Sequence, residues 1–180
     1  MLMTYSECIS KYGNPYQIEK MVKKECLFKI EDGIYSDTPC YSELGVLGKK
    51  YPKAVLTGGY AFYYYGFTDL VPEKYTFATS SKAAPITDSK IRQIYIRNDI
   101  FPLGVTVADI EDTEVKIYDK ERLLIELLRN KNLMPRDLYK EVIQHYREII
   151  DSLEIWRIQE YAATFPKSKL ISRALDEEVL

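Results

Sequence analysis

The feature that most constrains the fold is a short apolar segment that runs directly into two adjacent glycines. Residues 54–57 have the length and composition of a buried strand, and Gly58 and Gly59 follow at once. The residues 60–65 then predict a helix that ends at Gly66. Glycines between a strand and a helix permit a sharp turn, and they also permit a close approach of the backbone to a phosphate group. This segment therefore predicts a strand–turn–helix unit whose glycines serve either packing or ligand binding.

A strand that leads into Gly-Gly and a helix is also the opening motif of the nucleotidyltransferase fold. An active enzyme with this fold needs a pair of aspartates on the next strand to hold two metal ions. The next predicted strand, residues 75–79, offers no carboxylate, and Asp69 and Glu73 precede it in a loop that contains Pro72. We therefore interpret the segment as a nucleotidyltransferase-like scaffold without the metal site, in which the Gly-Gly turn mainly serves packing. We assign no catalytic residue, no metal ligand and no cofactor.

The N-terminal segment predicts two helices followed by a β-hairpin. Residues 4–12 form the first helix, and Asn14 can cap the second because Pro15 is tolerated at the first helical position. Residues 27–30 alternate like a strand, and Gly33 provides a turn before a returning strand. The order helix, turn, helix, hairpin is typical of a winged helix, whose second helix lies in the major groove of DNA.

The winged-helix interpretation assigns DNA contacts to polar residues of the second helix and the hairpin. These residues are Asn14, Tyr16, Gln17, Lys20, Lys23 and Lys24 on the helix and Lys29 on the hairpin. Acidic residues interleave the lysines, and the segment contains no arginine, the residue that most often recognises guanine. The net charge of −2 and the pI of about 5.6 exclude a strongly basic nucleic-acid binder but not a local basic face. A winged helix used for protein contacts and a solvated charged helix remain the alternatives.

The rest of the chain predicts an α+β domain. A polar linker at residues 36–39 precedes it and caps the next helix, so we place the two domains at residues 1–37 and 38–180. The second domain is expected to be nucleotidyltransferase-like, with a small mixed sheet and a C-terminal helical bundle. The predicted strands after residue 57 span residues 75–79, 92–97, 104–110 and 114–118.

The predicted helices of this second domain begin with residues 40–51. Asp119 caps the first helix of the bundle, and Pro135 opens the second. Two further helices are expected at residues 153–165 and 168–179. The helix opened by Pro135 carries a predicted apolar stripe of Leu138, Val142, Tyr146 and Ile149.

Cysteine and histidine usage does not indicate a metal site, a disulfide framework or a catalytic triad. The three cysteines are widely spaced and form no Cys-x-x-Cys pair, and His145 is the only histidine. A histidine without a nucleophile motif does not predict Ser–His or Cys–His chemistry. The N-terminus lacks the pattern of a signal peptide, and the nearly uncharged residues 54–68 are too short and too rich in glycine to cross a bilayer. We therefore expect a cytoplasmic protein without a membrane partner.

Three segments carry a resemblance to a known family. They are residues 5–35, whose wing is similar to the pattern Leu-x-x-x-x-x-Gly-x-Tyr, residues 56–68 and residues 117–128. Together they resemble the AbiEi family of abortive-infection proteins, the antitoxins and transcriptional autorepressors of type IV toxin–antitoxin systems. The resemblance implies operator binding by the winged helix and toxin neutralisation that needs the C-terminal domain. It also implies a partner toxin that is itself a nucleotidyltransferase, encoded beside the antitoxin.

The function predicted from the sequence is that of an antitoxin-like transcriptional regulator rather than an enzyme. It would bind the double-stranded DNA of its own promoter and counteract a nucleotidyltransferase toxin. A nucleotidyltransferase-like enzyme is one alternative, and metal-dependent labelling that requires Asp69 or Glu73 would support it. A protein-interaction module without a role in DNA binding is the other alternative.

Overall fold

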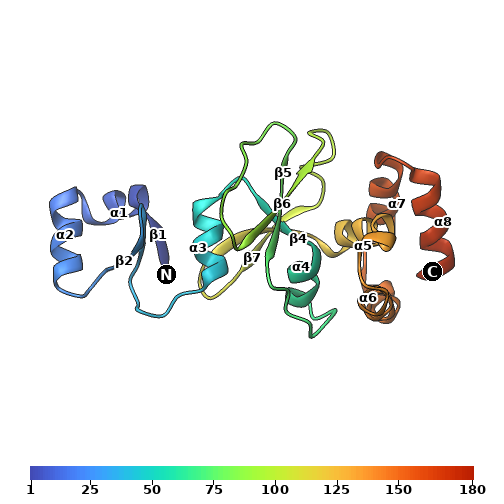
Figure 1. Cartoon of the computed structure of the whole chain (residues 1–180), viewed down its shortest axis with the longest axis horizontal. Coiled ribbons are helices and arrows are strands. Elements are labelled where there is room, and N and C mark those ends of the chain that lie inside the picture. The colour runs from blue at the N-terminus through green and yellow to red at the C-terminus, as the bar shows by residue number, and fades with distance from the viewer. The chain divides into compact units, whose positions relative to one another are not determined.

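The computed structural model describes residues 1–180, and the chain forms two compact units. The N-terminal unit comprises Met1–Ala54 and Val107–Lys116, and the C-terminal unit comprises Val55–Thr106 and Ile117–Leu180. One sheet is antiparallel and the other is mixed, and helices accompany both (Figure 1). The chain is therefore an α+β protein, as the sequence predicts.

The N-terminal unit contains a three-stranded sheet in which the first strand of the chain joins the hairpin. The strands lie in the order β1-β3-β2, and both pairings are antiparallel. The sequence does not predict β1, because three residues are too few to show an alternating pattern. In chain order the elements are β1 (Leu2–Thr4), α1 (Tyr5–Tyr12), α2 (Pro15–Lys23), β2 (Phe28–Glu31), β3 (Ile34–Ser36) and α3 (Glu43–Lys50).

Local hydrogen bonds fix the starts of α1 and α2. Thr4 and Glu7 form a capping box, in which each side chain accepts the backbone N–H of the other residue. Asn14 caps α2 by accepting the N–H of Gln17 at 3.0 Å. Gly33 turns the hairpin at a φ of 80°. Between these elements lies a small buried core of Met3, Cys8, Ile18 and Leu27.

The start of α3 lies later than the sequence predicts. The Oγ of Ser42 accepts the N–H of Gly45 at 3.3 Å and caps the helix. The prediction that residues 36–39 cap this helix is therefore wrong. Ser36 instead ends β3, where its hydroxyl accepts the N–H of Thr38 at 3.2 Å.

The apolar face of α3 packs against the N-terminal sheet. Val46 shares a buried cluster with Leu2 and Ile34. A Cβ added to Gly45 would lie 2.9 Å from Cδ1 of Leu2, so glycine permits the close approach of helix and strand. The compact unit consequently continues to Ala54, whereas the sequence suggests a boundary between residues 37 and 38.

The mixed sheet runs in the order β6-β5-β4-β8-β7. β4 is antiparallel to β5 and parallel to β8, and β5 is parallel to β6. The boundary between the two units passes through β7 and β8. The observed bounds fall within one residue of the predicted ones: β4 (Val55–Thr57), β5 (Tyr75–Ser80), β6 (Ile91–Ile96), β7 (Val105–Asp109) and β8 (Glu114–Tyr118).

The helices of the C-terminal unit gather around α5, which is buried along most of its length (Figure 1). Asp119 caps α5 as predicted, because its Oδ1 accepts the N–H of Arg122 at 2.7 Å. No helix of the chain is both long and apolar enough to cross a membrane. The helices and short 3-10 turns are α4 (Gly58–Tyr64), α5 (Lys120–Arg129), η1 (Lys131–Leu133), α6 (Arg136–Ile149), η2 (Ile150–Ser152), α7 (Ile155–Thr164) and α8 (Ser168–Glu178).

The buried face of α6 differs in part from the predicted stripe. Val142 and Tyr146 are buried, as predicted. Leu138 and Ile149 are half-buried. Tyr139 and Ile143 complete the buried face, because they lie one helical turn apart from each other and beside Val142 and Tyr146.

Candidate functional site

One face of α2 is open to solvent and carries Lys20 and Lys23 together with the exposed Glu19. Tyr16, Lys20 and Lys23 are spaced by four and three residues, which places them on the same side of the helix. All three are exposed, and 71% of the Tyr16 surface remains accessible. Ile18 is buried on the other side of the helix. The amphipathic pattern of α2 therefore directs its basic residues away from the core.

The lysines of α2 and of the β2–β3 hairpin differ in whether they already have an acidic partner. Lys20, Lys23 and Lys24 are exposed, and none of them forms an ion pair or a side-chain hydrogen bond. Lys29 on the hairpin donates a hydrogen bond to Asp32 at 2.6 Å, which raises the pKa of the lysine. The three lysines on and after α2 are therefore available to a ligand, whereas Lys29 would have to exchange its partner.

The remaining predicted DNA-contact residues lie at the start of α2. The side chain of Asn14 is occupied by its capping hydrogen bond to Gln17. Gln17 is half-buried, and its backbone N–H is the donor of that bond. The hydrogen bond between Asn14 and Gln17 therefore holds the helix terminus in place, and Tyr16 between them is exposed.

Two carboxylates of the N-terminal unit are paired with α3. Glu7 accepts a hydrogen bond from Lys49 at 2.8 Å, and Glu31 accepts one from Lys50 at 3.0 Å. Each pair joins one carboxylate to one ammonium group, so neither pair changes the net charge of the unit. Of the acidic residues that interleave the lysines in the sequence, Glu31 is therefore paired with α3, whereas Glu19 and Glu25 are exposed.

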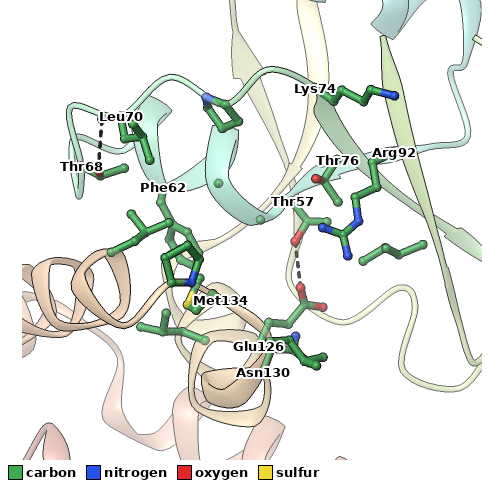
Figure 2. Close-up of a pocket in the computed structure, with 18 of the residues that line it drawn as sticks. Thr57, Phe62, Thr68, Leu70, Lys74, Thr76, Arg92, Glu126, Asn130 and Met134 are labelled. Atoms are coloured by element: carbon green, nitrogen blue, oxygen red, sulfur yellow. Dashed lines mark hydrogen bonds between the residues drawn. The ribbon is translucent and has the colours of Figure 1, made fainter. Parts of the chain in front are cut away.

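A second region of interest is a cavity of about 630 Å³ beside the Gly-Gly segment (Figure 2). It lies within the C-terminal unit and is lined by parts of β4, α4, β5, β6, α5 and α6.

Gly58 begins α4, so the helix starts two residues before the predicted start at residue 60. Gly58 has a φ of 65°, and a Cβ on Gly59 would lie 2.8 Å from Cγ of Pro72. Backbone conformation and packing thus account for both glycines.

A buried ionic network adjoins this cavity. The hydroxyl of Thr57 donates to Oε2 of Glu126 at 2.8 Å, and Nε and Nη2 of Arg122 donate to Oε1 at 3.2 and 3.0 Å. Arg122 is fully buried and also donates to the carbonyl of Ile100 at 2.7 Å. Its guanidinium lies 4.2 Å from the ring centroid of Phe165. Because each charged group has its partners, the network fits a structural role.

The acidic residues near the Gly-Gly segment are not arranged as a metal site. Asp69 and Glu73 are both outside the core, in the loop before β5, and only Glu73 lines the cavity. The other carboxylate of the cavity, Glu126, is held by Arg122 and Thr57. No group of three or more His, Cys, Asp or Glu side chains converges anywhere in the chain.

No protein-family model matches the chain, and no curated protein sequence matches it. A solved structure is similar: the crystal structure of the RV2827C protein from Mycobacterium tuberculosis, with a TM-score of 0.63 and 13% sequence identity. The alignment covers 98% of this chain and 71% of that chain. At this level of identity the similarity concerns the fold alone.

Sequence reasoning missed the buried pair of Arg122 and Glu126. An arginine and a glutamate four residues apart on a helix are usually a solvated pair, so their spacing alone does not predict burial. The available signal is that apolar residues occupy most other positions of residues 123–128. A helix with apolar residues on every side is buried, and its charged residues must then find partners in the interior.

Proposed function

We propose that the chain is an antitoxin-like transcriptional regulator that binds its own promoter and counteracts a nucleotidyltransferase toxin. The proposed promoter contact is made by the N-terminal unit, with α2 in the major groove and the β2–β3 hairpin as the wing. The element order β1-α1-α2-β2-β3 and the sheet order β1-β3-β2 support a winged helix. The resemblance of residues 5–35, 56–68 and 117–128 to AbiEi proteins supports the antitoxin role.

The observation that carries the DNA-binding proposal is the exposed face of α2. Lys20, Lys23 and Lys24 present unpaired ammonium groups beside the exposed Tyr16. Lysines on a groove-facing helix contact phosphate oxygens, and a tyrosine hydroxyl contacts phosphate or a base edge. Because α2 contains no arginine, most of its contribution to binding is expected to be electrostatic rather than sequence-specific.

The proposed function is tested by measuring repression and toxin neutralisation in the same cells. The chain is expressed beside a reporter driven by its own promoter and with the nucleotidyltransferase toxin encoded next to it. The wild-type chain should repress the reporter and restore growth. Changing Lys20, Lys23 and Lys24 together to glutamine should relieve repression and leave growth rescue intact, because the C-terminal unit is unchanged.

The matched control replaces three exposed lysines of the C-terminal unit, Lys82, Lys140 and Lys169, by glutamine. It changes the net charge by the same amount, so it should repress like the wild type. If the wild-type chain neither represses its promoter nor rescues growth, the proposed function is wrong. If both triple variants repress equally well, α2 is not the element that contacts DNA.

A further inference from the structure

The cavity beside the Gly-Gly segment has two chemically distinct halves. One half is polar and includes Thr57, Thr76, Arg92 and Glu126 (Figure 2). The other half is apolar, and Figure 2 places Phe62 and Met134 there, across the cavity from Arg92. A volume of about 630 Å³ lies within the range of small-molecule sites, which are mostly apolar and contain a few oriented polar groups.

Arg92 is an exposed cation of the cavity lining, and it has no partner within the chain. It projects from β6, and its guanidinium points toward the pair formed by Thr57 and Glu126 (Figure 2). It makes no ion pair and no side-chain hydrogen bond, although a guanidinium carries five N–H donors. The hydrogen bonds to the two oxygens of Glu126 come from Arg122 and Thr57 and not from Arg92.

The charges around the cavity favour an anion with about two negative charges. The lining includes three basic residues, Lys74, Arg92 and Arg129, and two acidic residues, Glu73 and Glu126. Buried Arg122 compensates Glu126, so the lining together with Arg122 carries an excess of two positive charges. A phosphate monoester carries about −1.5 to −2 at pH 7, and a guanidinium binds phosphate through two parallel hydrogen bonds.

We propose that this cavity is a binding site for a small organic phosphate monoester with an apolar or aromatic body. Its phosphate contacts Arg92 in the polar half, and its body lies against Phe62, Leu127 and Met134. The site does not depend on the proposed role in promoter binding, because all of its residues belong to the C-terminal unit. No acceptor or metal is required, since the proposed event is binding without a chemical step.

The test is a titration of the full chain with phenyl phosphate, followed by the methyl NMR signals of Ile94, Leu127 and Met134. Inorganic phosphate lacks the apolar body, and benzoate lacks the second negative charge, so these two serve as comparison ligands. Phenyl phosphate should give saturable shifts and bind more tightly than either comparison ligand. Non-saturating shifts would overturn the proposal, and so would benzoate binding as tightly as phenyl phosphate.

Two variants locate the site. Arg92→Gln should weaken phenyl phosphate binding by about tenfold or more, because a charge-assisted pair of hydrogen bonds is removed. Arg97→Gln is the matched control, since Arg97 follows β6, pairs with Asp99 and does not line the cavity. Met134→Trp should also weaken binding by filling the apolar half. Equal binding by wild type and Arg92→Gln would contradict the proposal.

Natural phosphate monoesters differ in their bodies, and a second titration separates them. Adenosine 5′-monophosphate offers an aromatic body, whereas glycerol 3-phosphate offers a small polar one. The apolar half predicts tighter binding of the adenosine compound. Tighter binding of glycerol 3-phosphate would contradict the assignment of the apolar half to the body of the ligand.

Discussion

Lys20, Lys23 and Lys24 of the N-terminal unit reach solvent without a partner, whereas Arg122 of the C-terminal unit is fully buried beside Glu126 and two aromatic rings. A solvated lysine keeps its hydration and loses little when it has no counter-ion. A buried guanidinium has no water around it, so the surrounding protein must satisfy its donors. A buried cationic side chain therefore needs its partners within the fold, whereas an exposed one can remain without them and stay free to bind a ligand.

The largest expected effect follows from removing the buried cation. Arg122→Ala leaves the Glu126 carboxylate buried and unpaired, which should reduce the free energy of unfolding by about 3–5 kcal/mol. The measurement is urea unfolding followed by the fluorescence of Trp156, the single tryptophan, which lies on α7 of the C-terminal unit. An exposed pair with the same four-residue spacing, Arg173 and Glu177, provides the control. Arg173→Ala should change stability by less than about 0.5 kcal/mol, and equal losses at both positions would contradict the comparison.

A smaller effect is expected at the Gly-Gly segment. Gly59→Ala places a Cβ 2.8 Å from the Pro72 ring, and the resulting shift should cost about 1–3 kcal/mol. The same unfolding measurement applies. Adding Pro72→Ala should recover part of the loss, because it removes the atom that the new Cβ would meet. If the losses of unfolding free energy caused by Gly59→Ala and by Pro72→Ala simply add in the double variant, the contact with Pro72 is not the reason why Gly59 is needed.

The sequence predicts elements with strong local signals and fails where an element depends on its partners. Asp119 and Asn14 indicate helix starts because a short polar side chain can accept a backbone N–H from its own segment. β1 is not predicted because its three residues become a strand only by pairing with β3. The continuation of the N-terminal unit through α3 likewise depends on the burial of Val46 beside Leu2, residues that are far apart in the sequence.

The two candidate sites likewise differ in how far the sequence predicts them. The basic residues of α2 are visible in the sequence, because helical spacing alone separates them from Ile18. The cavity cannot be predicted from the sequence, because its lining comes from separate elements. Arg92 lies on β6, Glu126 on α5 and Met134 in the segment before α6. Only the tertiary fold brings these residues to one place, and no periodicity in a single segment indicates it.

An effect of less than about 1 kcal/mol is expected for the exposed ion pairs of the N-terminal unit. Partial burial opposes ionisation of Glu7, but hydrogen bonds from Lys49 and from Thr4 outweigh it and lower the pKa of Glu7 below 4.5. The carboxylate therefore contributes stability above pH 4.5, and this contribution is lost as the pH falls through the lowered pKa. Glu7→Gln should remove that part of the acid dependence in thermal unfolding. An unchanged pH profile would show that the pair with Lys49 contributes nothing measurable.

The smallest effect on stability is expected for the α2 lysines. Changing Lys20, Lys23 and Lys24 together to glutamine should alter the free energy of unfolding by less than about 0.5 kcal/mol in total, because the side chains are exposed and unpaired. Thermal and urea unfolding of the triple variant provide the measurement. A large loss of stability would mean that these lysines serve the fold, as Arg122 does.

The salt dependence of promoter binding shows whether the α2 lysines contact DNA phosphates. Fluorescence anisotropy with the promoter duplex gives the affinity of wild type, the triple lysine variant and the control triple variant over a series of salt concentrations. Removal of one lysine–phosphate interaction should reduce the slope of log affinity against log salt by roughly one unit. We expect a shallower slope and weaker binding for the variant at Lys20, Lys23 and Lys24. The variant at Lys82, Lys140 and Lys169 should behave like the wild type. Identical slopes and affinities for all three proteins would contradict the assignment of DNA binding to α2.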